Sequence, residues 1–380
     1  MNNTATLRPS KGLAITYLVR LSIASPSGGR SEIENLNVIK KIREGFFDYP
    51  YASSQAMKRA LRDTLKGLGY SVSPIISSSP ARTAGDPIKY VDDDLFGYME
   101  AGSKKTGNSE VDKLNGIRKA VVSMTPLLSL REFQDNVDFG ANMMGLQTGS
   151  NPMPYETEVH RGWYRISLYI ELDRIGTGDG FIADIKSVDE KENLDELLKS
   201  EEEYDFVQVN GSKYFLMKKI FSRRDNTIAY NRAKALLDSI RFLAPSGRSS
   251  NWLIDLTPKL MVAAYVKGAR TPFLETPLLD EKQKDKNVIN LATIQTVKET
   301  FADGIESNGD NVCLVVGYRE DLIQLPTDSL KPIDKATAET KDLANKINVQ
   351  TMKIAFETID GWLKQHFNIQ DQKTSSTSQT

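Results

Sequence analysis

The clearest helical pattern in the chain runs from Tyr51 to Leu68. Apolar residues recur there at three- and four-residue spacing, which predicts a packed stripe, and cations recur four residues apart on another stripe. Ser53 or Ser54 is the expected N-cap, and Gly67 and Gly69 are expected to end the helix. The packed stripe consists of Met57, Ala60, Leu61, Leu65 and Leu68, and the cationic stripe of Lys58, Arg62 and Lys66, with Gln55 and Arg59 beside it.

The charges near the start of this helix favour a binding role. Lys58 and Arg59 lie in the first turns, where the helix dipole disfavours cations. A bound phosphate would reverse that penalty, because backbone N–H groups and the serine hydroxyls point out of the same end. A solvated basic surface is the alternative explanation.

Alternating patterns predict the strands. Ala14 to Ala24 places Arg20 on the face opposite the main apolar row, and Trp163 to Arg174 alternates strictly, as in a half-buried strand. Ile117 to Thr125 and Leu260 to Val266 are expected to be further strands, and a helix is expected from Asn226 to Leu243. Together these elements predict an α+β fold with a mostly antiparallel sheet, roughly βαββαβ with insertions.

Two loops are candidates for binding. The segment Leu130 to Arg161 is long and rich in Gly, Asn and Pro, so it is either a binding excursion or disordered. Pro245 to Ser250 is expected to form a turn that contains Arg248 and Ser249. These two residues either contact a phosphate or belong to an ordinary surface loop. The long segment also contains Met143, Met144 and Met153. Methionines of this kind either insert into a ligand as apolar wedges or fill gaps in the core.

Acidic segments allow two readings. Asp92, Asp93 and Asp94 fall in an expected short helix ending at Gly102, where they could hold Mg²⁺. Adjacent residues on a helix diverge and the dipole favours acids at its start, so capping is the better explanation. The stretch from Asp189 to Asp205 is expected to be an exposed helical insertion.

The C-terminal part predicts one strand and two helical segments. The strand is Val312 to Gly317, and the helical segments are Asn290 to Phe301 and Lys335 to His366. Trp362, Leu363 and Phe367 are expected to anchor the last helix, and residues 370–380 are expected to be disordered.

Composition narrows the function. The 380 residues carry a formal net charge of −1, so any polyanion site must be local. With only two histidines and one cysteine, a Cys/His zinc cluster cannot form, and no cofactor is expected. The chain has no apolar signal core or membrane-length run, which predicts a cytoplasmic protein without membrane contact.

Several segments, in order, resemble one family: the backbone subunits of type I CRISPR effector complexes (Cascade), within the RAMP superfamily. The similar segments are YASSQAMKRALR, RLSIASPSGG, DDDLFGYM and NWLIDLTPKLMVAAYV. The DevR-like, type I-B branch looks closest, judged by KYVDDDLFGYM and NPMPYETEVHRG. The resemblance covers most of Ile15 to Glu275.

The resemblance implies an RRM-like (ferredoxin-like) palm over residues 14–275. It also implies a finger-like helical insertion at 70–117 and a thumb hairpin at 130–162. The remaining expected parts are an acidic insertion at 175–224, a C-terminal extension at 276–369 and the tail. Such a subunit would be non-catalytic and would bind guide RNA through phosphates, because base pairing itself supplies sequence specificity.

The implied partners are the guide RNA, the target DNA strand paired to it, copies of this chain in a helical filament, and other Cascade subunits. Those subunits are a guide 5′-end cap, large and small subunits and a guide-processing endonuclease. The residues expected to contact RNA are Arg20, Ser25, Ser53, Ser54, Gln55, Lys58, Arg59, Arg62, Arg82, His160, Arg161, Arg248 and Ser249.

Two other functions stay open at this stage. One is a type III-like backbone that cleaves target RNA through Asp135 or Asp138 with Mg²⁺, suggested by two carboxylates in the excursion. The other is a free regulatory protein that binds its own transcript or promoter, suggested by the DevR resemblance alone.

Overall fold

The structure is a computed structural model in which the chain divides into two compact units. The first unit contains Met1–Val72, Val122–Asp173 and Asp238–Phe356, and the second contains Ser73–Val121, Arg174–Leu237 and Glu357–Thr380. The structure describes residues 10–31, 35–78, 81–87, 89–99, 117–142, 153–177, 181–183, 205–208, 215–219, 226–245, 252–268, 271–281, 286–309, 311–326 and 338–370.

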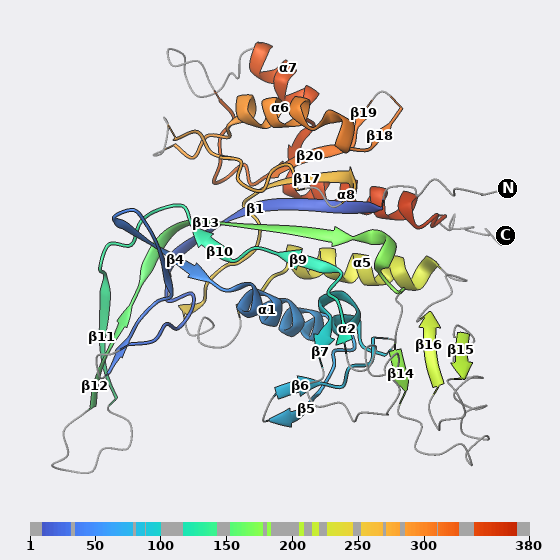
Figure 1. Ribbon diagram of the computed structural model, residues 1–380. Coiled ribbons are helices and arrows are strands. Elements are labelled where there is room, and N and C mark those ends of the chain that lie inside the picture. The colour runs from blue at the N-terminus through green and yellow to red at the C-terminus, as the bar shows by residue number, and fades with distance from the viewer. Residues whose placement is uncertain are drawn as a thin grey trace, which may run out of the picture. The chain divides into compact units, whose positions relative to one another are not determined.

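A nine-stranded sheet forms the centre of the first unit (Figure 1). Its strand order is β21-β20-β17-β1-β13-β10-β4-β3, and β9 also pairs with β13. Every pairing is antiparallel except that of β20 with β21, which confirms a mixed α+β fold with a mostly antiparallel sheet. The strands are β1 (Lys11–Ala24), β3 (Lys41–Glu44), β4 (Phe47–Ala52), β9 (Val122–Met124), β10 (Leu127–Ser129), β13 (His160–Glu171), β17 (Leu260–Lys267), β20 (Leu314–Tyr318) and β21 (Val349–Thr351).

The two long central strands are buried on both faces. The prediction of a half-buried strand after Trp163 is therefore wrong, because a central strand that is covered on both sides needs no polar face. In the register of β1 and β13, Leu18 lies opposite Arg165 and Arg20 lies opposite Trp163. Side chains of such cross-strand pairs point to the same face of a sheet. The Leu18 face packs against Leu291 and Ile294 of α6 (Leu291–Thr300).

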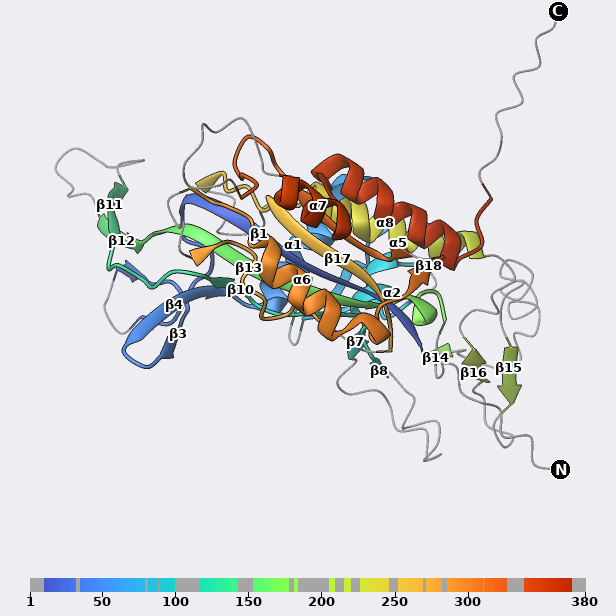
Figure 2. The same cartoon turned by 90° about the horizontal axis from the view of Figure 1, so that it is seen from above.

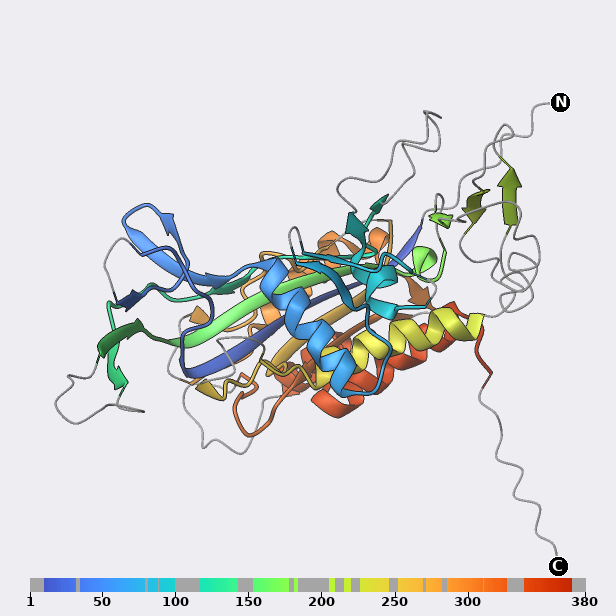
Figure 3. The ribbon, with the colours of Figure 1, turned by 90° about the horizontal axis from the view of Figure 1, so that it is seen from below.

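Helix α1 (Ser54–Gly67) lies on the other face of the sheet in the first unit, crossing β1 and β13 (Figure 3). It begins three residues later than predicted, because Tyr51 and Ala52 complete strand β4. Ser53 is the N-cap, and its Oγ accepts a hydrogen bond from the Ala56 N–H at 3.3 Å. Met57, Ala60, Leu61 and Leu65 are buried as predicted, whereas Leu68 at the C-cap is exposed.

The segment Leu130 to Arg161, for which composition predicts a binding excursion or disorder and the resemblance implies a hairpin, contains an antiparallel hairpin. Strands β11 (Val137–Asn142) and β12 (Met153–Glu158) pair with each other, and β12 also pairs in parallel with β2 (Leu36–Asn37). Backbone hydrogen bonds in this ladder satisfy the polar groups that an irregular loop would leave to water.

Two C-terminal predictions need correction. The segment Lys335 to His366 contains two helices, α7 (Ala338–Lys346) and α8 (Met352–His366), separated by β21. Asn348 has a φ of 53°, a turn conformation that ends the helical pattern there. The strand predicted from Val312 to Gly317 is divided between β19 (Asn311–Val312) and β20. The helix predicted from Asn290 is α6, and the Asn290 side chain caps it by accepting a hydrogen bond from the Thr293 N–H. At the last helix, Leu363 and Phe367 are buried, whereas Trp362 is partly exposed.

The second unit contains helices α2 (Val91–Phe96) and much of α5 (Asn226–Arg241). Its strands are β5 (Ile75–Ser78), β6 (Ala81–Thr83), β7 (Tyr98–Met99), β8 (Ile117–Arg118), β14 (Phe181–Ala183), β15 (Asp205–Gln208) and β16 (Phe215–Lys219). The strand expected from Ile117 to Thr125 is therefore two strands, β8 and β9. Helix α2 ends at Gly97, not at Gly102, and a side chain at Gly97 would collide with the Arg118 carbonyl oxygen.

The three adjacent aspartates lie in the first turn of α2, as predicted, but the N-cap residue, Tyr90, makes no side-chain capping hydrogen bond. Asp92 accepts from the Ser73 N–H at 2.7 Å, and Asp93 accepts from the Asp86 N–H at 3.0 Å. Asp94 pairs with both Arg118 and Arg232. All three are fully buried, and burial raises the pKa of Asp93. They hold the surrounding loops to the helix.

The stretch from Asp189 to residue 204 and the tail 371–380 fall outside the described residues. In the part of the chain that the structure describes, no helix is both long and apolar enough to cross a membrane.

Candidate nucleic-acid interface

The cationic side of α1 is built as the sequence predicts. No acidic residue lies in its first turn, and Lys58 has no carboxylate partner among the described residues. Burial, and then repulsion from Arg62, lowers the pKa of the Lys58 ammonium below its usual value. A phosphate beside Lys58 would favour the charged form and so relieve both effects.

Arg59 is less available to a phosphate ligand than the sequence suggests. Its Nε lies 3.0 Å from Asp63 Oδ2, in an ion pair one helical turn apart, and both side chains are exposed. Pairs of this kind contribute about 0.3–0.5 kcal/mol, so a phosphate could compete with Asp63. The cation with no such partner near the helix start is Lys58 rather than Arg59.

The polar groups at the helix start are partly engaged. Ser53 Oγ accepts the capping bond, which leaves its own O–H hydrogen free to donate. Ser54 Oγ donates to Gln55 Oε1 at 2.9 Å, and Gln55 is exposed. Hydroxyl, amide and ammonium groups thus occur together at one end of α1.

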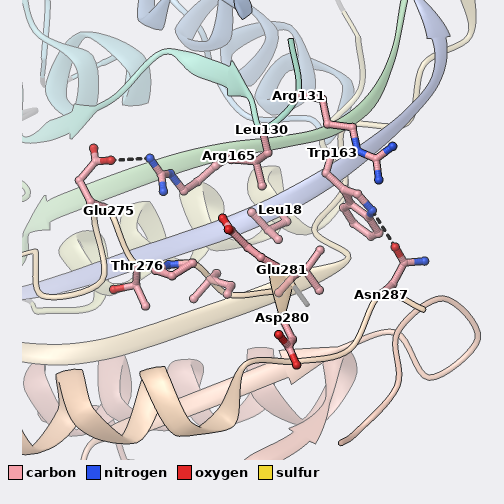
Figure 4. Close-up of a pocket in the computed structure, with 13 residues that line it drawn as sticks. Leu18, Leu130, Arg131, Trp163, Arg165, Glu275, Thr276, Asp280, Glu281 and Asn287 are labelled. Carbon is pink, nitrogen blue, oxygen red and sulfur yellow. Dashed lines mark hydrogen bonds and ion pairs between the residues drawn. The ribbon is translucent and has the colours of Figure 1, made fainter. Parts of the chain in front are cut away.

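A second cationic region lies at the end of the central sheet. Arg20, Arg131 and Arg161 line a cavity of about 440 Å³ together with Trp163 and Asn287. The Arg20 guanidinium lies 5.7 Å from the centre of the Trp163 ring, a cation–π distance. The Trp163 Nε1–H donates to Asn287 Oδ1 at 2.9 Å, which fixes the indole (Figure 4).

The cationic residues do not form one continuous track. Arg20, Arg161 and Trp163 share the face of the sheet that packs against α6, by strand alternation and register. Helix α1 lies on the opposite face (Figures 1 and 3). The structure therefore brings Arg20 and Arg161 together but separates both from Lys58 and Arg62.

Two predicted contacts lie inside the protein. Ser25 is completely buried, and its hydroxyl has no hydrogen-bond partner among the described residues. His160 is also buried, with Nδ1 2.8 Å from Tyr164 Oη and Nε2 3.3 Å from the Glu132 carbonyl oxygen. Burial lowers the pKa of His160, so the ring is a neutral packing group. Ser25 follows the end of β1 into the core, whereas His160 is the first residue of β13 and is among the residues that line the cavity of about 440 Å³.

The remaining predicted residues are placed only in part. Arg82 lies in β6 and Met153 in β12, but the positions of their side chains are outside the described residues. Met143, Met144, Arg248 and Ser249 fall outside them altogether. Asp135 and Asp138 are exposed beside and within β11, and Asp135 has a φ of 30°.

Sequence reasoning missed Arg131, Trp163 and Arg165 as potential site residues. Arg165 lies on the same face as Leu18, and its Nη2 is 2.6 Å from Glu275 Oε2. Alternation along Trp163 to Arg174 already placed Arg165 opposite the apolar row, as it did for Arg20. Arg131 had no such signal, because it follows a short strand that only pairing reveals.

Comparisons with known proteins identify a matching family and one relative. The family model "CRISPR-associated negative auto-regulator DevR/Csa2" matches residues 55–287. A relative from Myxococcus xanthus (strain DK1622), "CRISPR-associated protein Cas7/Cst2/DevR", is 36% identical over 94 residues. That alignment covers 23% of this chain and 30% of the relative, so this chain matches less than a third of the relative's length.

Two chains of solved structures match most of this chain at low sequence identity. A chain of a "CRISPR RNA-guided surveillance complex" has a TM-score of 0.47 and 13% identity, covering 92% of this chain and 99% of that one. A chain of a "CRISPR RNA-guided surveillance complex, pre-nicking" has a TM-score of 0.48 and 12% identity, covering 93% and 99%.

Proposed function

This chain belongs to the family of CRISPR-associated negative auto-regulators DevR/Csa2, and from that premise we propose that it is a non-catalytic, RNA-binding backbone subunit. Copies of it would polymerise along a CRISPR guide RNA in a type I surveillance complex, of the I-B kind, that pairs the guide with target DNA. The other Cascade subunits named above would be its further partners.

One observation carries the proposal: the N-terminal half of α1 presents cations and donors without a compensating acid in the first turn. Lys58 is half-buried beside Arg62, and its charged form is disfavoured in the isolated protein. Ser53, Ser54 and Gln55 stand at the same end. Phosphates would satisfy these groups whatever the base sequence, as a guide-binding subunit requires.

The family suggests how the parts of the fold are used. We assign the part of the central sheet that lies within residues 14–275 to an RRM-like palm and the hairpin of β11 and β12 to a thumb within 130–162. Residues 70–117 would be the finger, 175–224 the acidic insertion, 276–369 the C-terminal extension and 370–380 the tail. Arg20 and Arg161 would contact nucleic acid separately from α1, because they lie on the other face of the sheet.

The test is to replace Lys58 and Arg62 by alanine and to measure affinity for single-stranded RNA over a range of salt concentrations. Each lost phosphate contact should reduce the slope of log K against log salt by about 0.7. Two RNAs of equal length and unrelated sequence should lose affinity equally. Lys341→Ala, an exposed cation on α7, is the control and should change neither quantity. An unchanged slope in the Lys58 and Arg62 variants would exclude the assignment.

A further inference from the structure

The hairpin of β3 and β4 carries an unusual exposed side chain. Phe46 lies in its turn, after Gly45 with a φ of 61°, and is 98% exposed. The neighbouring Phe47 and Ile42 are also about half exposed, at 52% and 55%. Leaving so much apolar surface in water forgoes the stabilisation that burial gives, which makes this tip a candidate contact surface.

The tip is held firmly in place. Arg43 Nε and Nη2 donate to the two carboxylate oxygens of Asp48 at 2.9 and 3.0 Å, across the strands. The Phe133 N–H donates to the Asp48 carbonyl oxygen at 2.7 Å, which ties the base of the hairpin to the chain after β10. Figure 2 shows the hairpin standing out at the edge of the sheet in the first unit. Presenting Phe46 to a partner would therefore cost little conformational entropy.

The same unit contains a cavity that an aromatic ring would fit. Leu18, Leu130, Trp163 and Leu278 line a cavity of about 340 Å³ whose other lining residues lie mainly in the segment 275–281 (Figure 4). A cavity of roughly 150 Å³ is enough for a benzene-sized ring. The chain's own Phe46 does not fill it, since that side chain is almost fully exposed.

The charges at the hairpin tip and at the cavity are partly complementary. Arg131 at the mouth of the cavity is exposed and has no carboxylate partner among the described residues, while Arg165 is paired with Glu275. Glu44, exposed beside the tip, is the one acid of the turn. The cavity also has Asp280 and Glu281 on its opposite wall, so a cation in the docked segment would be tolerated there as well.

We propose that the tip of one copy inserts Phe46 into the Leu18–Trp163 cavity of the next copy, with Glu44 facing Arg131. The inference rests on the proposed function in that copies must lie side by side along RNA. The contact joins two different patches of the same chain, so it is heterologous and extends into an open helical filament. A second copy is favoured over another partner because both halves of the contact occur on this one chain.

Cross-linking tests the contact directly, with and without RNA. Phe46→Cys protein is mixed with Leu130→Cys protein under mild oxidation. The mixture should give a disulfide-linked dimer that neither variant gives alone. The native Cys313 is buried and should stay unreactive. A mixture that gives no heterodimer under either condition would overturn the proposal, and this outcome does not depend on RNA binding.

Assembly on RNA separates this contact from RNA binding itself. Phe46→Ala should bind an RNA that holds one copy as wild type does, but should lose at least about tenfold in affinity on an RNA several times longer. Phe301→Ala removes another exposed aromatic ring and should assemble normally. Glu44→Arg and Arg131→Glu should each weaken assembly, and the double variant should regain it. Wild-type assembly by Phe46→Ala would refute the contact, whereas failure of wild type on the short RNA would refute only the proposed function.

Discussion

Asp94 shows how one buried carboxylate can organise a large part of the second unit. Its Oδ2 accepts from Arg232 Nη1 at 2.7 Å and from the Gly176 N–H at 2.9 Å, and its Oδ1 pairs with Arg118. The two arginines come from β8 and α5, far from α2 in sequence. A buried carboxylate that is shared by two buried guanidinium groups has a structural role.

We predict that Asp94→Ala lowers the free energy of unfolding by about 3–5 kcal/mol, because it removes the buried carboxylate that two buried guanidinium groups share. Urea unfolding followed by circular dichroism measures the change. Asp63→Ala is the control, since it removes an exposed partner of Arg59 and should cost at most about 0.5 kcal/mol. Equal effects of the two substitutions would contradict the assigned role of Asp94.

At the scale of single elements, the N-terminus of α1 links stability to binding. Ser53 caps the helix through a long hydrogen bond of 3.3 Å, and no acid lies in the first turn. Replacing Ser53 by aspartate keeps a cap and adds a negative charge close to Lys58. That charge should stabilise the free protein by about 0.3–1 kcal/mol and should also occupy the position proposed for a phosphate.

The prediction is therefore that Ser53→Asp raises the melting temperature while it weakens RNA binding. Ser53→Asn is the matched variant, because asparagine caps equally well without a charge, and it should leave both properties near wild type. Thermal unfolding and RNA titration at one salt concentration are sufficient measurements. Stronger RNA binding by Ser53→Asp would show that the phosphates do not lie at this helix end.

Periodicity predicted the helices and strands in which apolar side chains recur at a regular spacing. Helix α1 and strands β1 and β17 have strong one-face or all-apolar patterns, and each was placed within a few residues of its observed bounds. The hairpin of β3 and β4 was missed because its alternating side chains are exposed on an edge, where pattern carries no burial signal. The break between α7 and α8 depends on Asn348, whose backbone conformation only the folded chain reveals.

The candidate site was predictable in its parts but not in its arrangement. The cationic face of α1 follows from spacing alone, yet the separation of Arg20 and Arg161 from it depends on which face of the sheet each element covers. Register and layer order are tertiary properties, and a single sequence does not encode them locally. The burial of His160 has the same origin, since its ring is covered by Tyr164 and the Glu132 backbone.

At the scale of the whole molecule, the exposed carboxylates of Asp135 and Asp138 bear on whether the chain would hold RNA or cut it. Asp138 lies opposite Thr157 in the ladder of β11 and β12, while Asp135 precedes β11 in a left-handed conformation. Metal-assisted cleavage needs ligands that converge on one ion and hold it against the scissile phosphate. Asp138, within strand β11, and Asp135, just before it, differ in backbone conformation, so their carboxylates are poorly arranged for that purpose.

We therefore predict that assembled protein incubated with Mg²⁺ and labelled RNA complementary to its guide leaves the RNA intact. Asp135→Asn and Asp138→Asn should give the same result and should retain assembly on the guide. Denaturing gels with a long time course measure this outcome, and a complex lacking bound guide controls for contaminating nuclease. Products at regular intervals that disappear in either asparagine variant would instead require a cleaving backbone. In that case the thumb would act at each position where successive copies meet, because regular spacing can come only from the repeat of the filament itself.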